Sequence, residues 1–213
     1  MYPITIIDNF FPDPDKVVEY GINQEFFPTT DGRWPGKRTK PLLDINPTLF
    51  KFVGEKIHNI FYENVEDWFA DVRFQLIEPF SNDQYDIRNQ GWIHKDNGTN
   101  FAGVIYLDKN PDNDTGTSMF RERNGYSVQH KDCNAVKEKF YMGEEVPDEL
   151  YSQAFHGMNS QYVETVKVKN VYNRLVMFNN KQHHGVPTFG TKNRLTMTIF
   201  SSGVIGPPPP LYR

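Results

Sequence analysis

The sequence of 213 residues has one cysteine, Cys133, which excludes an internal disulfide framework and is typical of a reducing compartment. It has no apolar run close to membrane-spanning length and no basic-then-apolar leader at its start. Its 23 lysines and arginines are scattered and the net charge is -4, so no basic stripe indicates a nucleic-acid partner. These absences predict a cytoplasmic protein that binds neither membranes nor nucleic acids.

Apolar residues make up 38% of the chain and aromatic residues 15%, which is enough to build a sizeable core at this length. The sequence has no internal repeat, and its one low-complexity block is the run of four prolines at 207–210. We therefore expect one domain over residues 1–205, followed by an extended proline-rich tail over residues 206–213.

The N-terminal part of the chain predicts a strand and two helices. Ile4–Ile7 is a β-branched run that is typical of a short strand. Helices are expected to begin at Asp13-Pro14 and at Asn46-Pro47, because each pair sets a capping side chain before a proline of the first turn. His58 falls in the second helix with no partner ligand one turn away, so we expect an ordinary surface or boundary residue.

From residue 71 onward the sequence has short β-branched or aromatic runs, divided by turn-forming clusters. The expected strands cover residues 72–77, 101–107, 162–168, 174–178 and 194–200. The stretch 132–157 is more helical and polar, and we interpret residues 121–161, which contain it, as an insertion. This order predicts an α+β, mainly β fold, in which residues 71–205 form a jelly-roll core (a double-stranded β-helix). The helices of residues 1–70 would brace one face of it.

His94-Lys95-Asp96 is the most informative motif, because residues two apart in an extended chain point to one face and can share an ion. The tripeptide alone is weak evidence, since it occurs again at His130-Lys131-Asp132. We favour the first copy, which a turn and a strand follow. The second leads into a helical stretch, where Asp132 is better explained as a helix cap. Too few strands also remain after it to complete a jelly roll around a metal.

A third ligand is available in His183-His184, which follow the strand ending at Phe178. In an extended segment only one of two adjacent histidines easily faces the ion. Two histidines and a carboxylate form the facial triad that holds Fe(II) with open positions. In the strand 194–200, alternation places Arg194, Thr196 and Thr198 on one face and apolar side chains on the other. A buried arginine needs an anion, and a bidentate carboxylate is its natural partner.

In this order the residues resemble the 2-oxoglutarate- and Fe(II)-dependent dioxygenases, specifically the prolyl-4-hydroxylase-like branch. The opening residues 6–14 also resemble small phage and marine-bacterial members. In the family the distal histidine lies six positions past the phenylalanine of the preceding strand, which selects His184, ten residues before Arg194. The elements that carry the resemblance are His94-Lys95-Asp96, Tyr106-Leu107-Asp108, the turn 115–120, His184-Gly185-Val186-Pro187 and Arg194.

The resemblance implies Fe(II) as the metal, 2-oxoglutarate and O2 as co-substrates, and ascorbate as a candidate reductant. The implied metal ligands are His94, Asp96 and His184. Arg194 would hold the far carboxylate of 2-oxoglutarate, and the residues expected to help it are Tyr106, Thr196 and Thr198. Halogenating members lack the carboxylate ligand, so its presence favours hydroxylation. The expected reaction couples decarboxylation of 2-oxoglutarate to succinate with C–H hydroxylation of a peptidyl or small-molecule substrate.

Two other classes of function stay open. The same three ligands could form a structural metal site in a non-catalytic, partner-binding jelly roll, or hold zinc in a hydrolase. Arg194 argues against the hydrolase, because hydrolysis gives no reason for a dicarboxylate anchor. Tyr106 is equally well explained as a core aromatic. Thr115, where the family usually has glycine, and the 121–161 insertion, a candidate lid, leave the substrate open. Further candidates for the pocket wall are Trp92, Arg121 and Tyr126.

Overall fold

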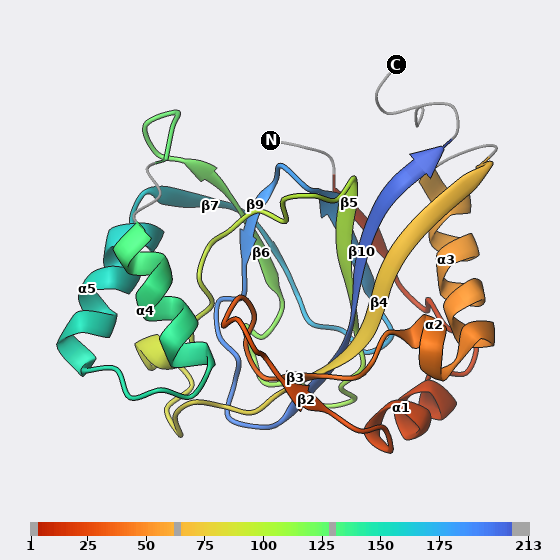
Figure 1. Ribbon diagram of the computed structural model, residues 1–213, viewed down its shortest axis with the longest axis horizontal. Coiled ribbons are helices and arrows are strands. Elements are labelled where there is room, and N and C mark those ends of the chain that lie inside the picture. The colour runs from red at the N-terminus through yellow and green to blue at the C-terminus, as the bar shows by residue number, and fades with distance from the viewer. Residues whose placement is uncertain (1–3, 62–64, 128–130, 206–213) are drawn as a thin grey trace.

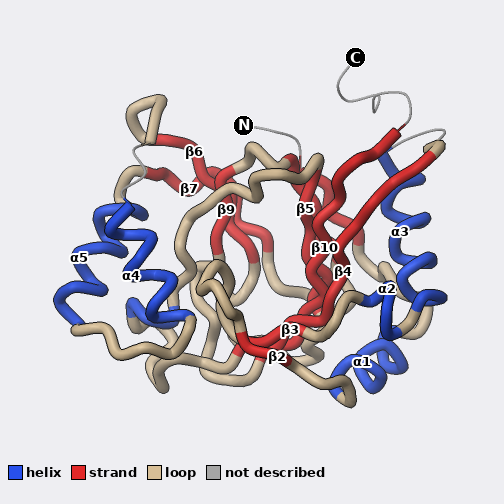
Figure 2. The backbone as a smooth tube through the Cα atoms, viewed as in Figure 1, coloured by secondary structure: helices blue, strands red, loops and turns tan. Residues whose placement is uncertain are grey.

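The computed structural model describes residues 4–61, 65–127 and 131–205, and it is mainly β (Figures 1 and 2). Among these residues, antiparallel strands form a larger sheet in the order β1-β8-β5-β10-β4-β3-β2 and a smaller one in the order β7-β6-β9. The strands are β1 (Ile4–Ile7), β2 (Phe27–Pro28), β3 (Lys37–Arg38), β4 (Asp67–Ile77), β5 (Phe101–Tyr106), β6 (Thr117–Glu122), β7 (Tyr162–Val168), β8 (Leu175–Asn179), β9 (His183–Gly185) and β10 (Arg194–Ile205).

Two of the helices begin where capping chemistry predicts. The Asp13 carboxylate accepts the N–H of Lys16, and the Asn46 side chain accepts the N–H of Leu49 at 3.0 Å. The proline-rich tail and His130 of the second tripeptide lie outside the described residues. The helices are α1 (Pro14–Ile22), α2 (Leu42–Ile45), α3 (Pro47–Phe61), α4 (Lys131–Tyr141) and α5 (Asp148–Asn159), with a 3-10 turn η1 at Ile87–Asn89.

β10 lies inside the larger sheet, hydrogen-bonded to β4 and β5, and its two faces differ as the alternation predicts. Leu195, Met197 and Ile199 are buried in the main core, where α1 and α3 contribute Val17, Val53 and Ile57. Figure 1 shows α1, α2 and α3 along this side of the sheet. The opposite face turns toward the smaller sheet and leaves a pocket between the two. Side chains of α1 and α3 thus pack against the face of the larger sheet that carries Leu195.

The stretch 121–161 contains α4 and α5, which pack together at the end of the molecule away from α3 (Figure 1). Their apolar side chains, among them Tyr151 and Phe155, form a second core around Trp92. The prediction of helical structure here is confirmed. Asp132, expected as a helix cap, instead lies inside the first turn of α4, because the helix begins one residue earlier.

The expectation that His58 is a surface or boundary residue is wrong, since its side chain is only 1% exposed. Its Nδ1–H donates to the carbonyl of Gly54 at 2.6 Å, Nε2 lies 2.9 Å from Ser201 Oγ, and the ring stacks on Trp68 with centroids 4.6 Å apart. Burial is the main cause that lowers the pKa of His58 below its usual 6.5. It therefore joins α3 to β10 as a neutral group.

Replacing His58 with glutamine is expected to lower the free energy of unfolding by about 1–3 kcal/mol above pH 6.5, because buried polar atoms lose their partners. The unfolded state binds a proton more readily than folded His58, so the stability due to this residue is lost as pH falls from 6.5 toward the lower folded pKa. Urea unfolding at several pH values should show a shallower acid loss in His58→Gln. His156→Gln, on the exposed face of α5, should match wild type.

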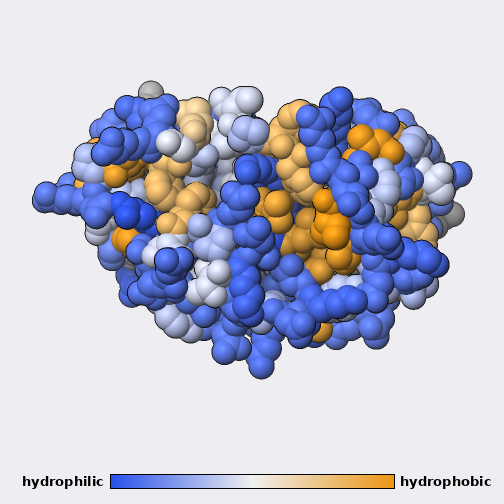
Figure 3. All heavy atoms as spheres, turned by 90° about the horizontal axis from the view of Figure 1, so that it is seen from below, coloured by the Kyte–Doolittle hydropathy of each residue, from blue (hydrophilic) through white to orange (hydrophobic). Residues whose placement is uncertain are grey.

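Figure 3 shows a largely hydrophilic face of the molecule, with apolar side chains gathered between hydrophilic rims. None of the helices in the described parts of the chain is long and apolar enough to cross a membrane.

Candidate metal centre

His94 and His184 face each other across a single antiparallel bridge. Each donates its backbone N–H to the carbonyl of the other at 3.0 Å, and their rings lie 4.4 Å apart. Directly opposed residues project to the same side of a strand pair, so the bridge aims both imidazoles at one point. His94 lies outside the named strands and occupies one isolated bridge position between irregular segments.

Asp96 completes the cluster from the same segment. Its Oδ2 lies 3.3 Å from His184 Nε2, and its Oδ1 lies 3.7 Å from His94 Nε2. One ligand atom from each of the three residues falls within 4.8 Å of the others. Two imidazole nitrogens and a carboxylate oxygen that lie this close together can all bind one divalent transition metal.

Backbone carbonyls fix the tautomer of both histidines. His94 Nδ1 lies 2.8 Å from the carbonyl of Trp92, and His184 Nδ1 lies 3.0 Å from the carbonyl of Gln182. A carbonyl only accepts hydrogen bonds, so in the neutral form of each ring Nδ1 carries the proton and Nε2 keeps its lone pair. A histidine that binds a metal through one ring nitrogen usually donates the N–H of the other to a hydrogen bond of this kind.

The electrostatics of the cluster favour a bound cation. Burial raises the pKa of Asp96, but His184, which is close and hydrogen-bonded, outweighs it, and the pKa falls to about 2. Desolvation, followed by the nearby His184, lowers the pKa of His94 to about 4, although 47% of its side chain opens into the pocket. Burial lowers the pKa of His184, yet Asp96 raises it above its ordinary value. Asp96 is ionised and His94 neutral at neutral pH, as metal binding needs.

Arg194 lines the same pocket, whose cavity has a volume of about 130 Å³. Its side chain is 3% exposed, and its Nε has no hydrogen-bond partner among the described residues. The guanidinium carbon lies 5.7 Å from the centre of the Tyr106 ring. A guanidinium keeps its charge at neutral pH, so a buried one with an unused donor calls for an anionic ligand.

Of the other residues predicted for the site, some line the pocket and others do not. Thr196 and Thr198 line the pocket beside Arg194. Tyr106 is fully buried, and its hydroxyl forms a 2.7 Å hydrogen bond with Thr117 Oγ1, a residue of the pocket wall. Trp92 lines the pocket, whereas Arg121 and Tyr126 do not. Arg121 is exposed on β6 of the smaller sheet, and Tyr126 is 67% exposed.

His183 points away from the cluster, as neighbouring residues on a strand do. Its Nδ1 lies 3.2 Å from Glu122 Oε1, and its ring packs on Tyr162 at 4.6 Å. It is buried behind the metal ligands and is not available to the same ion.

One wall of the pocket was missed entirely by the sequence reasoning. It comes from the segment 33–38, from β4 and from α4. The one available signal was the cation-rich, aromatic run Arg33-Trp34-Pro35-Gly36-Lys37-Arg38. The missed polar residues of this wall are Arg33, Arg38, Gln75, Lys137 and Tyr141.

A family model described as "Family of unknown function (DUF6445)" matches residues 1–200. The chain belongs to this family. A search of curated proteins gives this DUF6445 member no match.

Several solved structures are similar to this DUF6445 chain over most of its length. A prolyl hydroxylase from Trichoplax adhaerens, in complex with a hypoxia-inducible-factor oxygen degradation domain peptide fragment, has a TM-score of 0.55 at 13% identity, covering 93% of this chain and 83% of its own. A Pseudomonas putida prolyl-4-hydroxylase has a TM-score of 0.52 at 15% identity, covering 95% and 93%. HygX from Streptomyces hygroscopicus, with nickel and 2-oxoglutarate bound, has a TM-score of 0.56 at 10% identity, covering 94% and 83%. The fold of this chain is therefore similar to that of prolyl hydroxylases and of HygX.

Proposed function

We propose that this protein is a 2-oxoglutarate- and Fe(II)-dependent dioxygenase that hydroxylates a peptidyl or small-molecule substrate. Residues 1–205 would form its single domain, with the two facing sheets as a jelly-roll core. The observation that carries the proposal is that a metal-sized cluster of His94, Asp96 and His184 shares one pocket with the buried, unpaired Arg194.

The donor set fits Fe(II), because three ligands on one side of an ion leave positions for a chelating co-substrate and for O2. His94 and His184 would hold the metal through Nε2, since their Nδ1 protons are committed to backbone carbonyls. Asp96 would supply the negative charge. When bound, iron would supply the redox chemistry that couples decarboxylation of 2-oxoglutarate to succinate with hydroxylation of a C–H bond.

The protein's own contribution would be orientation and desolvation. Arg194 would bind the far carboxylate of 2-oxoglutarate, and the hydroxyls of Thr196 and Thr198 offer further donors on the same strand face. Tyr106 would act indirectly, because its hydroxyl is hydrogen-bonded to Thr117 and holds that residue in the pocket wall. The burial of Arg194 keeps water from competing for the carboxylate, which strengthens a charge-assisted pair.

The direct test is succinate formation from 2-oxoglutarate by protein loaded with Fe(II), in air and with ascorbate as reductant. We expect slow turnover without substrate, and its loss when a chelator removes the metal. A protein that binds the metal but neither binds nor decarboxylates 2-oxoglutarate would instead have a structural metal site.

A further inference from the structure

The metal ligands lie where two hollows meet. The pocket already described, here called the inner pocket, contains Arg194. A second hollow of about 500 Å³, here called the outer cleft, is lined by Asn97 and Thr99 on one side and by α4 and α5 on the other. His94 and Asp96 line both. If the inner pocket takes the co-substrate, as in the proposed function on which this inference rests, the outer cleft is left for the substrate.

Arg38 stands at the junction of the two hollows. Its guanidinium carbon lies 4.4 Å from the centre of the Trp34 ring and 5.3 Å from that of Phe200. Its Nη2 donates to Gln75 Oε1 at 3.4 Å, while its buried Nε has no partner in the described parts of the chain. Burial, the largest cause, lowers the pKa of Arg38 to about 10, so the group is still a cation at neutral pH.

The backbone around Arg38 is held firmly. Arg38 pairs with Gln75 of β4, and the Gln75 side chain also donates to the carbonyl of Pro35 at 2.7 Å. Gly32 and Gly36 have positive φ, and a Cβ at either position would collide with the backbone of Glu138 or Leu76. This close approach to α4 and β4 keeps Arg38 aimed at the pocket.

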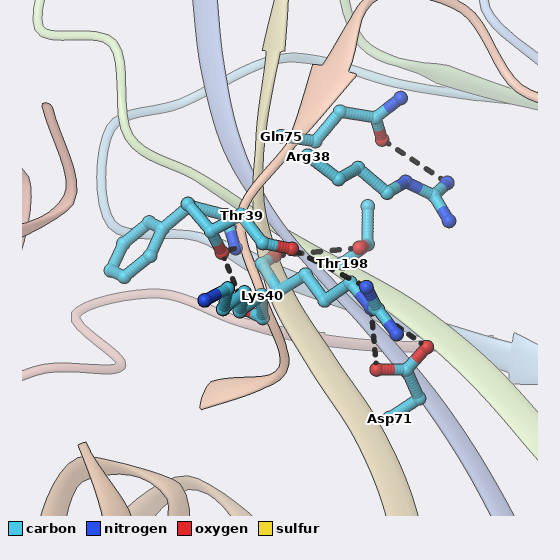
Figure 4. Close-up of polar contacts among 8 residues, drawn as sticks. Arg38, Thr39, Lys40, Asp71, Gln75 and Thr198 are labelled. Atoms are coloured by element: carbon cyan, nitrogen blue, oxygen red, sulfur yellow. Dashed lines mark hydrogen bonds and ion pairs between the residues drawn. The ribbon is translucent and has the colours of Figure 1, made fainter. Parts of the chain in front are cut away.

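Among the described residues Arg38 has no carboxylate within ion-pair distance, although Asp71 and Asp96 are near enough for their charges to act on it. Asp71 forms an ion pair with Arg73 at 2.8 Å. Arg73 lies two residues before Gln75 on β4. Figure 4 shows Arg38 extending beside Gln75, apart from Asp71. On the opposite wall, Lys137 of α4 lines both hollows. It has no ion pair within 4 Å among the described residues, although the charges of Glu138 and Asp31 act on it from farther away. Two unpaired cations therefore face the space beside the metal ligands.

The co-substrate does not account for Arg38. The backbone of Arg38 pairs with Gln75, which lies opposite Thr196 of β10. Its guanidinium packs over Phe200, which lies four residues farther from Arg194 than Thr196 does, or roughly 13 Å along an extended strand. Arg38 and Arg194 thus serve opposite ends of the inner pocket, and the metal ligands are close to the Phe200 end. The ring of Phe178 packs on His184. Phe178 pairs with Ala102 on the neighbouring strand, and Ala102 in turn pairs with Phe200.

We infer that Arg38, with Lys137 on the facing wall, binds an oxyanion group of the substrate, either a carboxylate or a phosphate. An unpaired, largely desolvated guanidinium gains most from an anion that uses two of its donors. The substrate is then an anionic molecule whose charged group lies at Arg38 and whose reacting carbon reaches the metal.

Calorimetric titration of protein loaded with Mn(II) and saturating 2-oxoglutarate tests this inference with three probes: benzoate, phenyl phosphate and the neutral benzamide. Aromatic probes suit a cleft that Trp34 and Trp92 also line. At least one anion should bind about 10-fold more tightly than benzamide. A preference for phenyl phosphate assigns a phosphate-bearing substrate, and a preference for benzoate assigns a carboxylate.

Arg38→Gln should abolish this preference, and Arg38→Lys should retain part of it. Arg121→Gln, which removes an exposed charge outside both hollows, is the matched control and should keep it. Lys137→Gln, in a half-buried helix position, should reduce the preference a few-fold and guards against misfolding of the Arg38 variants.

Equal binding of benzamide and both anions, or an unchanged preference in Arg38→Gln, overturns the inference. So does an Arg38→Gln variant that loses affinity for 2-oxoglutarate while keeping the anion preference, because Arg38 would then serve the co-substrate. Failure of the proposed function looks different: wild-type protein with Mn(II) would not bind 2-oxoglutarate, whereas the anion preference can still be measured without it.

Discussion

Replacing Asp96 or His94 with alanine is expected to weaken metal binding by more than about 100-fold and to abolish succinate formation. Each residue supplies one of three donor atoms that lie within 4.8 Å of one another. Loss of a residue that merely supports a ligand already costs about 10- to 100-fold in affinity, so loss of a ligand should cost more. Asp96→Ala also removes the negative charge that offsets the cation.

Mn(II) titration, followed by electron paramagnetic resonance of the free ion, measures the affinity of each variant. His156→Ala is the matched control, because its side chain is exposed on α5 and bonds within its own helix. Wild-type affinity in both His94→Ala and Asp96→Ala would show that the cluster is not the metal site.

Replacing Arg194 with glutamine is expected to raise the KM for 2-oxoglutarate by about 100-fold while leaving metal affinity unchanged. Two charge-assisted hydrogen bonds to a carboxylate would be lost, at about 1.5 kcal/mol each, and each 1.4 kcal/mol is a factor of ten. Without ligand the variant should be as stable as wild type or more so, because a buried guanidinium with an unpaired Nε is costly.

Initial rates of succinate formation against 2-oxoglutarate concentration give the KM, and thermal unfolding gives the stability. Arg73→Gln, a change of the same size at a half-exposed arginine paired with Asp71, is the control and should keep the wild-type KM. A KM that stays within a few-fold of wild type in Arg194→Gln would remove Arg194 from the co-substrate site.

The residues of the candidate site that could be predicted from sequence are those fixed by local spacing. His94 and Asp96 are two residues apart, and Arg194 opens a strand whose alternation is plain in the letters. The larger helices and strands were predictable for the same reason, since a capping pair or a β-branched run marks each one.

The opposite wall of the pocket was not predictable, because it depends on long-range packing. β2 and β3 are two residues each, too short for any periodic pattern, and Arg38 reaches the pocket only through pairing with β4. Lys137 comes from α4, nearly one hundred residues later. His58 was misjudged likewise: its burial depends on Trp68 and Ser201, which no helical pattern reveals.

The central claim, that one pocket binds metal and 2-oxoglutarate together, is tested most directly by titrating 2-oxoglutarate into metal-free and Mn(II)-loaded protein. If the co-substrate bridges the metal and Arg194, the two ligands must strengthen each other's binding. We expect 2-oxoglutarate to bind at least about 10-fold more tightly with Mn(II), and this difference to be lost in Asp96→Ala. The same affinity with and without the metal would contradict it.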